Sequence, residues 1–592
     1  MKMRIEWDVP IQMEDGVVLR ADVFRPVSEG RYPVIMTHGP YAKGLAFQEG
    51  FPGMWKILSA KYPDAVAGSS NRYQNWETVD PEKWVPEGYV CVRVDSRGAG
   101  RSPGYLDIFS LRETRDYYEC IEWAGVQPWS NGKVGLLGIS YYAVNQWQVA
   151  ALQPPHLAAI CPWEGASDYY RELTHHAGIL NNFVSVWYPV QVASVQHGVG
   201  ERGARNPSTG EAVAGPETLP EKELAGRHAD SIGALVTHPF DDEYYRERSA
   251  QLEKITVPLL SAANWSHALH TRGNFEGYTR ASSEQKWLEV HGLEHFAEFY
   301  TDYGVKLQKR FFGHFLKGED TGWDQQPSVL LNVRHVDGSF EVRSEKEWPL
   351  PRTRWTRLHL HPEVDPEGGR LTRGAPVVRS SVDFEALCEG VTFTTEPFTQ
   401  EVEITGPAAA RLFVSSTTTD ADLFLTLRVL DPNGKDVTFV SALDPAGVVA
   451  AGWLRASHRA TDPQRSRPER PWHPHDRAEP LTPGQVIPLD VEIWPTSVVI
   501  PVGYRLALTV QGRDFEFAGD GPWPSVYGVR MKGHGMFVHV DPHDRPADIF
   551  GGTTTLVSGP DQESYLLLPF IPRTAESSRA PRRGPFARTG HS

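Results

Sequence analysis

Residues 133–142 read KVGLLGISYY, and this stretch decides the fold. Its short apolar run predicts a buried strand, and the residues after Ser140 have helical character. A serine on such a sharp strand-to-helix turn exposes its hydroxyl, and backbone N–H groups and the positive end of the helix face whatever the oxygen attacks. Tyr142 stands where the fuller Gly-x-Ser-x-Gly motif has its second glycine. Ser140 is therefore a candidate nucleophile. Because the motif around it is short, the assignment depends on finding the other catalytic residues elsewhere in the chain.

Strand-like and helix-like patterns alternate on both sides of this stretch. Such alternation predicts a mostly parallel sheet covered by helices. The expected strands are 17–24, 33–37, 89–95, 257–263 and 287–290, and the expected helices are 115–123, 273–281 and 306–316. The sequence thus predicts an α/β core made of two pieces, residues 1–162 and 256–325.

Three regions depart from this alternation. Residues 163–255 mix aromatic residues and histidines with a Gly-, Glu- and Pro-rich stretch, which predicts an inserted helical cap with loops. From residue 326 helix signals nearly vanish, and short β-rich runs between Gly, Pro and Asn turns predict an all-β jelly roll over 326–572. The Pro-, Arg- and Ser-rich tail, 573–592, is expected to be disordered.

Composition excludes several classes of function. The 592 residues carry a net charge of −15, with no long basic run before the tail, so nucleic acid and anionic membranes are not expected partners. Four scattered cysteines make neither a disulfide framework nor a zinc site and fit a reducing compartment. The N-terminus lacks the apolar stretch of a signal peptide, and no apolar run of about 18 residues predicts a membrane span. We therefore expect a cytoplasmic protein.

A nucleophilic serine needs a base, and a histidine stands where one is expected. In an α/β fold of this kind an acid and then a histidine follow the nucleophile, each just beyond a later strand. His295 lies on the loop after the last predicted strand of the core, 287–290. His291 is the competitor, but it abuts the strand and has less freedom to reach the serine. We favour His295 as the base.

Donors for an oxyanion are expected at the end of another strand. Tyr41 follows the predicted strand 33–37, and its phenol can donate a hydrogen bond alongside the backbone N–H of Tyr141. A tyrosine at a strand end is also an ordinary packing residue, so this assignment depends on the rest of the pattern.

Several longer motifs, spread over nearly the whole chain, carry a family resemblance. They are MEDGVVLRADVFRP (13–26), GPYAKG (39–44), DSRGAGRS (95–102), QPWSNGKVG (127–135), GISY (138–141), FFGHFLKG (311–318) and PVGYRL (501–506). From about Ile5 to Pro569 the chain resembles the family of cocaine esterase, α-amino acid ester hydrolases and X-Pro dipeptidyl peptidases. The resemblance implies an α/β-hydrolase core, an inserted helical cap and a C-terminal jelly roll that helps to wall the active site. By position it implies Ser140 as nucleophile, His295 as base, and Tyr41 with the N–H of Tyr141 as oxyanion hole.

One position departs from that family. Its members commonly carry a Gly-Trp-Tyr-Asp-like segment after the next-to-last core strand, and the Asp orients the histidine. Here residues 263–270 read ANWSHALH, so Ser266 or His267 stands at the carboxylate position. Three explanations stay open: Glu276 reaches back to His295, His267 is a weaker orienting group, or the catalytic set is defective. Glu276 is the preferred acid, because a glutamate can bridge the longer distance.

These residues predict a serine hydrolase that cleaves carboxylic esters, with amides as a further option, of small acyl substrates through an acyl-enzyme. No metal and no organic cofactor is expected. The aromatic residues of the cap suit an apolar acyl or aryl pocket, with Trp163, Tyr169 and His175 as candidate substrate contacts. The alternatives are an X-Pro dipeptidyl peptidase-like hydrolase and a catalytically silent homologue that binds ligands. The sequence leaves the oligomeric state open, a homo-oligomer included.

Overall fold

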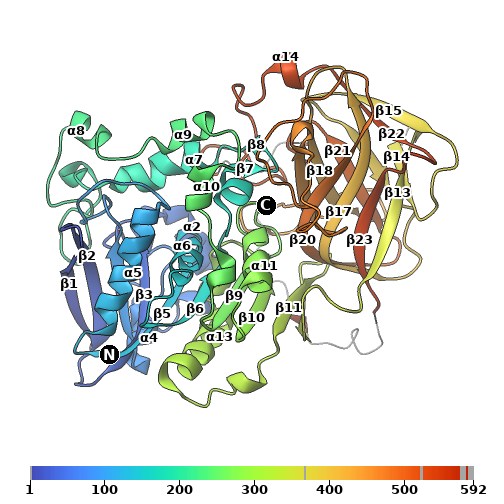
Figure 1. Cartoon of the computed structure of the whole chain (residues 1–592). Coiled ribbons are helices and arrows are strands. Elements are labelled where there is room, and N and C mark those ends of the chain that lie inside the picture. The colour runs from blue at the N-terminus through green and yellow to red at the C-terminus, as the bar shows by residue number, and fades with distance from the viewer. Residues whose placement is uncertain (1–2, 366–367, 520–524, 574–581, 584–592) are drawn as a thin grey trace.

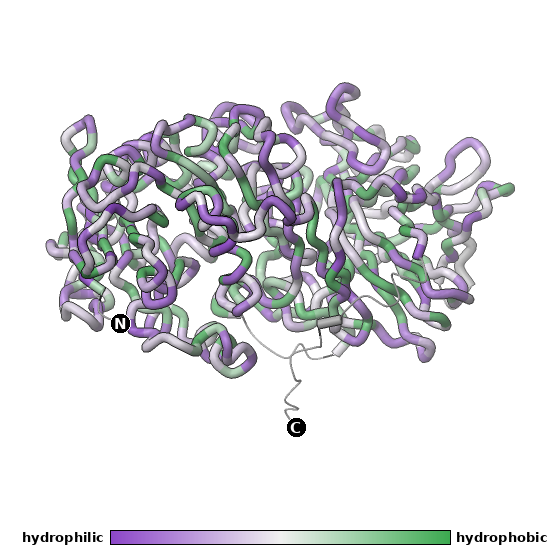
Figure 2. Tube along the Cα trace, turned by 90° about the horizontal axis from the view of Figure 1, so that it is seen from below, coloured by the Kyte–Doolittle hydropathy of each residue, from purple (hydrophilic) through white to green (hydrophobic). Residues whose placement is uncertain are grey.

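The computed structural model describes residues 3–365, 368–519, 525–573 and 582–583. The chain forms an α/β half, which contains the N-terminus, and a β half built from later residues (Figure 1). Hydrophobic strand segments lie inside both halves, and hydrophilic loops cover their periphery (Figure 2). Most of the tail expected to be disordered, 573–592, lies outside the described residues.

The α/β half is built on one mixed sheet whose strand order is β1-β2-β4-β3-β5-β6-β9-β10-β11-β12-β24. The strands from β4 to β11 pair in parallel, and antiparallel strands flank them. The strand bounds are β1 (Met3–Gln12), β2 (Val18–Pro26), β3 (Tyr32–Gly39), β4 (Val90–Asp95), β5 (Ser130–Ile139), β6 (Leu157–Trp163), β9 (Leu259–Asn264), β10 (Lys286–His291), β11 (Val329–Arg334), β12 (Phe340–Glu345) and β24 (Arg582–Arg583). The predicted core strands are confirmed.

Helices cover this sheet because its parallel strands are apolar on both faces. α5 (Leu111–Gly125) begins at Ser110, whose side chain accepts a hydrogen bond from the N–H of Glu113 and caps the helix. The other main helices are α6 (Tyr141–Ala150), α11 (Thr271–Arg280) and α13 (Asp302–Phe312), and the shorter ones are α1 (Phe47–Gly50), α2 (Pro52–Lys61), α3 (Pro63–Val66), α4 (Pro81–Trp84) and α12 (Ala297–Tyr300). The predicted helices at 115–123, 273–281 and 306–316 are thus confirmed to within a few residues.

The segment between β6 and β9 holds short helices, loops and a small antiparallel hairpin. Its helices lie along one edge of the α/β half and reach the β half (Figure 1). The elements are β7 (His175–His176), β8 (Ile179–Leu180), α7 (Phe183–Trp187), α8 (Glu221–Ala225), α9 (Ser231–Thr237) and α10 (Glu243–Glu247).

The β half is a mostly antiparallel domain whose strands close on themselves, and β14 and β16 are its parallel pair. β17 pairs with β20 on one side and with β23 on the other, and the pairings continue through β19, β18, β21, β16, β14 and β13 back to β23. The strands are β13 (Arg354–Asp365), β14 (Gly368–Thr372), β15 (Ser380–Glu385), β16 (Val391–Thr394), β17 (Val402–Ser416), β18 (Asp422–Leu430), β19 (Ala450–Arg455), β20 (Ile487–Ile500), β21 (Arg505–Gln511), β22 (Thr553–Ser558) and β23 (Tyr565–Ile571), and α14 (Ala547–Phe550) precedes β22.

The first strands after residue 326 pair with the sheet of the α/β half. β11 and β12, which the sequence pattern placed in the β domain, extend the first sheet beyond β10. Their short β-rich pattern is the same in either sheet, so periodicity alone does not assign them.

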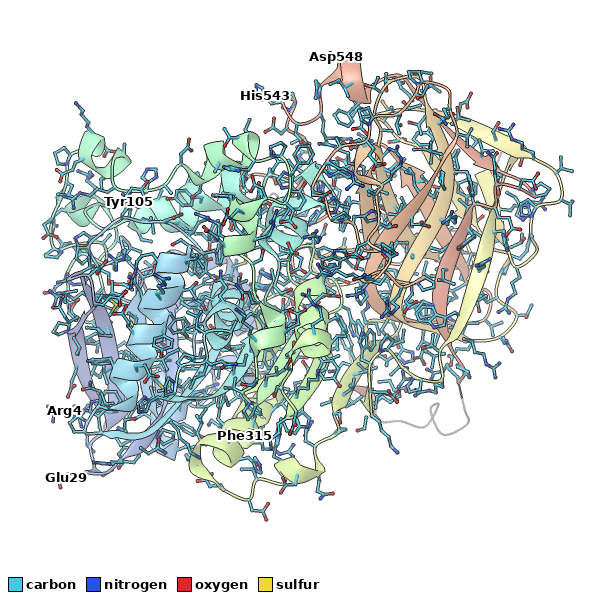
Figure 3. All side chains as sticks on the ribbon, in the orientation of Figure 1. Arg4, Glu29, Tyr105, Phe315, His543 and Asp548 are labelled. Carbon is cyan, nitrogen blue, oxygen red and sulfur yellow. The ribbon has the colours of Figure 1, made fainter. Side chains whose placement is uncertain are left out.

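The two halves meet along a boundary filled with side chains (Figure 3). Arg272 of α11 forms an ion pair with Glu492 of β20 (3.1 Å), and Arg334 of β11 donates to the backbone of Ser497 (2.8 Å). None of the helices in the described part of the chain is long and apolar enough to cross a membrane. The four cysteines are unpaired thiols.

Candidate active site

Ser140 lies on a strained turn between β5 and α6. Its φ of 56° and ψ of −115° belong to a region that side-chain-bearing residues rarely adopt, and such strain gathers at functional sites. Gly138 makes the turn possible, because a Cβ there would lie 2.4 Å from Cβ of Tyr142. The N–H of Ser140 donates to the backbone oxygens of Trp163 (3.2 Å) and Glu164 (3.1 Å), just beyond the neighbouring strand β6. The half-buried hydroxyl is thereby fixed at the carboxyl edge of the sheet.

The two predicted oxyanion donors lie next to each other. Tyr41 follows β3, and its ring centroid is 5.7 Å from that of Tyr141. The indole N–H of Trp187 donates to the hydroxyl oxygen of Tyr41 (3.0 Å), so the Tyr41 O–H is left to donate elsewhere. Burial, followed by the charge of Glu77, raises the pKa of Tyr41 well above its usual value, which keeps the phenol protonated. Tyr141 is the first residue of α6, where N–H groups have no partner within the helix.

His295 lies between two carboxylates. Its Nδ1 is 2.9 Å from Oε2 of Glu164, and its Nε2 is 2.9 Å from Oε1 of Glu77. Burial by itself lowers the pKa of His295, but the charges and hydrogen bonds of Glu164 and Glu77 outweigh it and raise the pKa to about 9. His295 is therefore an imidazolium in the resting protein at neutral pH.

Glu164 is the carboxylate that the sequence reasoning missed. It follows β6 directly, has a φ of 50°, and is buried. Its Oε1 accepts hydrogen bonds from Nε2 of His291 (2.8 Å) and from Nδ2 of Asn264 (3.3 Å), while Oε2 faces His295. Burial raises the pKa of Glu164, but the two histidines outweigh burial and hold it below its ordinary value. The position of Glu164 just after a core strand was the available signal. The expected order of catalytic residues along the chain placed the acid after a later strand instead.

These contacts form a buried row in which carboxyl groups alternate with imidazoles. His291 places Nδ1 2.7 Å from Oε2 of Glu289 and Nε2 on Glu164, so the order is Glu289, His291, Glu164, His295, Glu77. Burial opposes the charge on His291, yet Glu289 and Glu164 raise its pKa to about 10. His291, the competitor for the base, binds the other carboxylate oxygen of Glu164 and holds Glu164 in place beside His295.

A second pair of histidines stands in the turn after β9. Nε2 of His270 is 3.0 Å from Oγ of Ser140, and the backbone N–H of Ala166 donates to Nδ1 of His270 (3.0 Å). The backbone N–H of Leu269 donates to Nδ1 of His267 (3.1 Å). Burial, and then the neighbouring histidines, lower the pKa of both imidazoles well below the usual value, so both are neutral.

His267, His270 and His295 each place one nitrogen within 4.8 Å of the others. Such a cluster resembles a metal-binding set, but the donor chemistry does not fit one. A metal ligand nitrogen must be unprotonated. In His267 and His270, Nδ1 already accepts a backbone N–H, so the proton of each neutral ring is on Nε2. His267 and His270 are therefore hydrogen-bond donors through Nε2.

Glu276 is not placed as the sequence reasoning expected. It lies in α11 and its carboxylate forms ion pairs with Arg470 of the β half and with Arg280 (3.5 Å). Both ring nitrogens of His295 are held by Glu164 and Glu77 instead. The expectation that Glu276 reaches His295 is wrong, because α11 directs this side chain toward the β domain.

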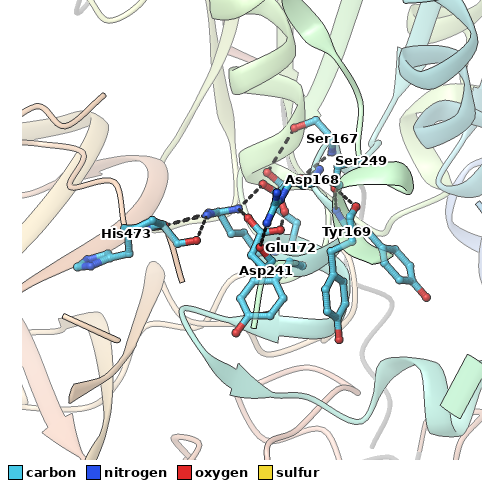
Figure 4. A network of polar contacts seen from close by, with 12 residues as sticks. Ser167, Asp168, Tyr169, Glu172, Asp241, Ser249 and His473 are labelled. Carbon is cyan, nitrogen blue, oxygen red and sulfur yellow. Dashed lines mark hydrogen bonds and ion pairs between the residues drawn. The ribbon is translucent and has the colours of Figure 1, made fainter. Parts of the chain in front are cut away.

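The three candidate substrate contacts are buried packing residues in this structure. Trp163 ends β6 and stacks on His291 (ring centroids 5.1 Å apart), and His175 stacks on Tyr170 (4.4 Å). Tyr169 lies among aromatic rings beside a polar network (Figure 4). In that network Arg171 donates to the backbone oxygen of His473 (2.8 Å) and joins the inserted segment to the β half. A substrate role for these three residues stays a prediction.

A cavity of about 90 Å³ opens beside the second histidine pair, where the two halves meet. His267 lines it from the turn after β9, and Nε2 of His267 has no hydrogen-bond partner among the described residues. Most of the aromatic walls come from the β half, and Trp265 adds one from the turn after β9; those of the β half are Phe424, Trp453, Trp494, Phe515 and Phe537. The cavity thus combines apolar walls with the N–H of His267, and Ser140 is not among the residues that line it.

The fold and this site define a serine hydrolase of the α/β-hydrolase class. Residues 15–297 match the family model of X-Pro dipeptidyl-peptidase (S15 family), and residues 321–567 match that of the X-Pro dipeptidyl-peptidase C-terminal non-catalytic domain. The chain belongs to the CocE/NonD family of hydrolases.

Individual relatives include both esterases and peptidases. A CocE/NonD family hydrolase from Staphylococcus aureus is 32% identical, with a TM-score of 0.82 over 97% of this chain and 94% of that one. The cocaine esterase of Rhodococcus sp. is 23% identical over 96% of this chain and 98% of its own length. An aminopeptidase from a Thaumarchaeota archaeon shares the fold, at 17% identity and a TM-score of 0.67, over 96% of each chain.

Proposed function

We propose that this serine hydrolase cleaves carboxylic esters of small acyl compounds through an acyl-enzyme on Ser140. The observation that carries the proposal is the strained turn that holds Ser140 beside imidazoles, at the edge of the sheet where a carboxylate-backed histidine also lies. The similarity to a cocaine esterase over 96% of this chain makes esters the first substrates to test, with X-Pro amides as the comparison.

In the first half of the reaction Nε2 of His295, in the neutral ring, leaves Oε1 of Glu77, which it contacts in this structure (2.9 Å). It then takes the hydroxyl proton of Ser140 as Oγ bonds to the ester carbon. Glu164 holds Nδ1 of the same ring and stabilises the imidazolium that forms. The carbonyl electron pair moves to oxygen, where the Tyr41 hydroxyl and the N–H of Tyr141 donate to the oxyanion. His295 then protonates the leaving alkoxide as the ester C–O bond breaks, and an acyl-Ser140 remains.

Water completes the cycle by the same groups. It gives a proton to His295 while its oxygen attacks the acyl carbon, and the C–Oγ bond breaks as His295 returns the proton to Ser140. The products are the free acid and the unchanged protein. No step requires a metal or an organic cofactor.

The neighbouring segments supply the pocket in this proposal. The inserted segment acts as a helical cap, since its Trp187 orients Tyr41, and the β domain, of the jelly-roll type, walls the acyl or alcohol site with the aromatic side chains of the cavity. The protein acts on a small molecule in the cytoplasm, without nucleic acid or membrane.

The test is Ser140→Ala assayed on p-nitrophenyl acetate and butyrate, with a fluorophosphonate probe as a second readout. We expect turnover to fall to background and labelling of the wild type to map to Ser140, with an unchanged melting temperature in the variant. Esterase activity retained by Ser140→Ala, or no labelling of the wild type, contradicts the proposal.

A comparison of esters with X-Pro amides distinguishes an esterase from an X-Pro dipeptidyl peptidase-like hydrolase. We expect the wild type to turn over the aryl esters faster than an X-Pro p-nitroanilide of matched concentration. Faster cleavage of the anilide favours the X-Pro dipeptidyl peptidase-like alternative.

A further inference from the structure

We propose that His270 is a catalytic hydrogen-bond donor to Oγ of Ser140, permanently neutral with its proton on Nε2, and that it is not the base. The inference rests on the proposed function and deepens it. Its starting point is that His270, not the predicted base His295, is the imidazole in hydrogen-bond contact with the serine oxygen (3.0 Å).

The surroundings of His270 fix its tautomer. The backbone N–H of Ala166, two residues beyond Glu164, donates to Nδ1 (3.0 Å), and this contact requires a lone pair on Nδ1. A neutral ring with a lone pair on Nδ1 carries its proton on Nε2. The nitrogen that faces Ser140 is therefore N–H, and it has no lone pair with which to take the hydroxyl proton.

Becoming an imidazolium is equally disfavoured. A second proton would have to sit on Nδ1, against the Ala166 N–H. His270 also lies at the N-cap of the ten-residue helix α11, whose positive end opposes a cation, and near the charged His295. The carboxylate-backed His295 is thus left as the proton acceptor, once its Nε2 leaves Oε1 of Glu77. One nitrogen of His295 lies within 4.8 Å of a nitrogen of His270.

The donor acts where charge develops on Oγ. During acylation the Oγ–H bond breaks toward His295 while the Oγ–C bond forms, and His270 keeps its own proton and stabilises the negative charge on Oγ. During deacylation the same N–H stabilises the negative charge that develops on Oγ as the C–Oγ bond breaks and His295 returns the proton. The neighbouring His267 is locked in the same tautomer by Leu269, so the turn after β9 presents N–H groups rather than bases.

The test compares two substitutions at this position with a matched one elsewhere. His270→Gln keeps an N–H near the position of Nε2, and His270→Leu removes it; His473→Gln, a buried histidine of the β half, is the control. Removal of one preorganised donor lowers kcat on the order of 10²–10³-fold, so we expect that loss for the Leu variant, a loss of less than tenfold for Gln, and none for the control. In both His270 variants the acid limb of the profile of kcat/KM against pH should lie at the same pH as in the wild type, because His295 sets this limb.

Equal losses in the Gln and Leu variants together with a vanished acid limb would make His270 the base and overturn the proposal. A readout without turnover is ¹⁵N NMR of selectively labelled histidine, where His270 should show a neutral ring protonated on Nε2 from pH 6 to 9. A signal of an Nδ1-protonated ring would contradict it. Ser140→Ala, assayed in parallel, distinguishes the two ways of failing. If Ser140→Ala keeps its activity, the proposed function itself is wrong; if it loses activity while the His270 variants behave otherwise than expected, only the inference about His270 is wrong.

Discussion

The turn after β6 and the turn after β9 lie on neighbouring parallel strands, yet they carry opposite chemistry. The first holds the carboxylate of Glu164 against His295, and the second holds the neutral imidazoles of His267 and His270. The family resemblance placed the acid at the second turn. In this chain the orienting carboxylate stands one strand nearer to the nucleophile.

The shift is possible because parallel strands end at one edge of the sheet, so neighbouring turns reach the same point in space. A catalytic set is defined by geometry rather than by position in the chain. The turn after β9 holds no carboxylate. Its His270 contacts Ser140, and its His267 lines the cavity between the two halves.

The largest expected effect on kcat comes from removing the carboxylate of the turn after β6. Glu164→Gln removes the charge that holds His295, and by analogy with loss of a triad carboxylate we expect kcat to fall on the order of 10³–10⁴-fold. Glu276→Gln, the matched variant at the acid position favoured by sequence, should change kcat less than threefold, or about 0.6 kcal/mol in barrier. Aryl ester kinetics with circular dichroism of both proteins provide the measurement. Reversed effects in folded proteins would return the acid role to Glu276.

An intermediate effect concerns pH. The base must be neutral to accept the serine proton, so with a His295 pKa of about 9 we expect kcat/KM of the wild type to rise with pH up to about 9. Glu77→Gln removes one of the two charges that favour the imidazolium, which lowers the pKa of His295 and moves the acid limb to lower pH. A pH profile of both proteins tests this, and an unmoved or upward-shifted limb would show that Glu77 does not control the base.

The smallest expected effect is at the oxyanion donor. Trp187→Phe removes the N–H that orients the Tyr41 hydroxyl, and loss of one hydrogen bond of about 1 kcal/mol predicts about a fivefold lower kcat. Tyr188→Phe, on the adjacent position of the same segment, is the control. Steady-state kinetics at saturating ester give the comparison, and equal values for the two variants would remove Trp187 from the site.

Much of the architecture followed from local pattern. The apolar run before Ser140 and the helical residues after it predict β5 and α6, because side-chain periodicity and glycine placement act over a few residues. The same patterns located Tyr41 and His295 just beyond core strands. The sheet to which β11 and β12 belong was not predicted, because a short strand has the same sequence pattern in either sheet.

The sequence by itself determined the strand-to-helix turn of Ser140, the α/β order of the core and the histidine after β10. Only the tertiary structure decided which groups stand behind those residues. Glu164 and His295 are 131 positions apart, and Ala166 and His270 are 104 apart. Such contacts depend on which strands pair and where each ends at the shared edge of the sheet. No local pattern carries that information, because it arises from packing of the whole domain.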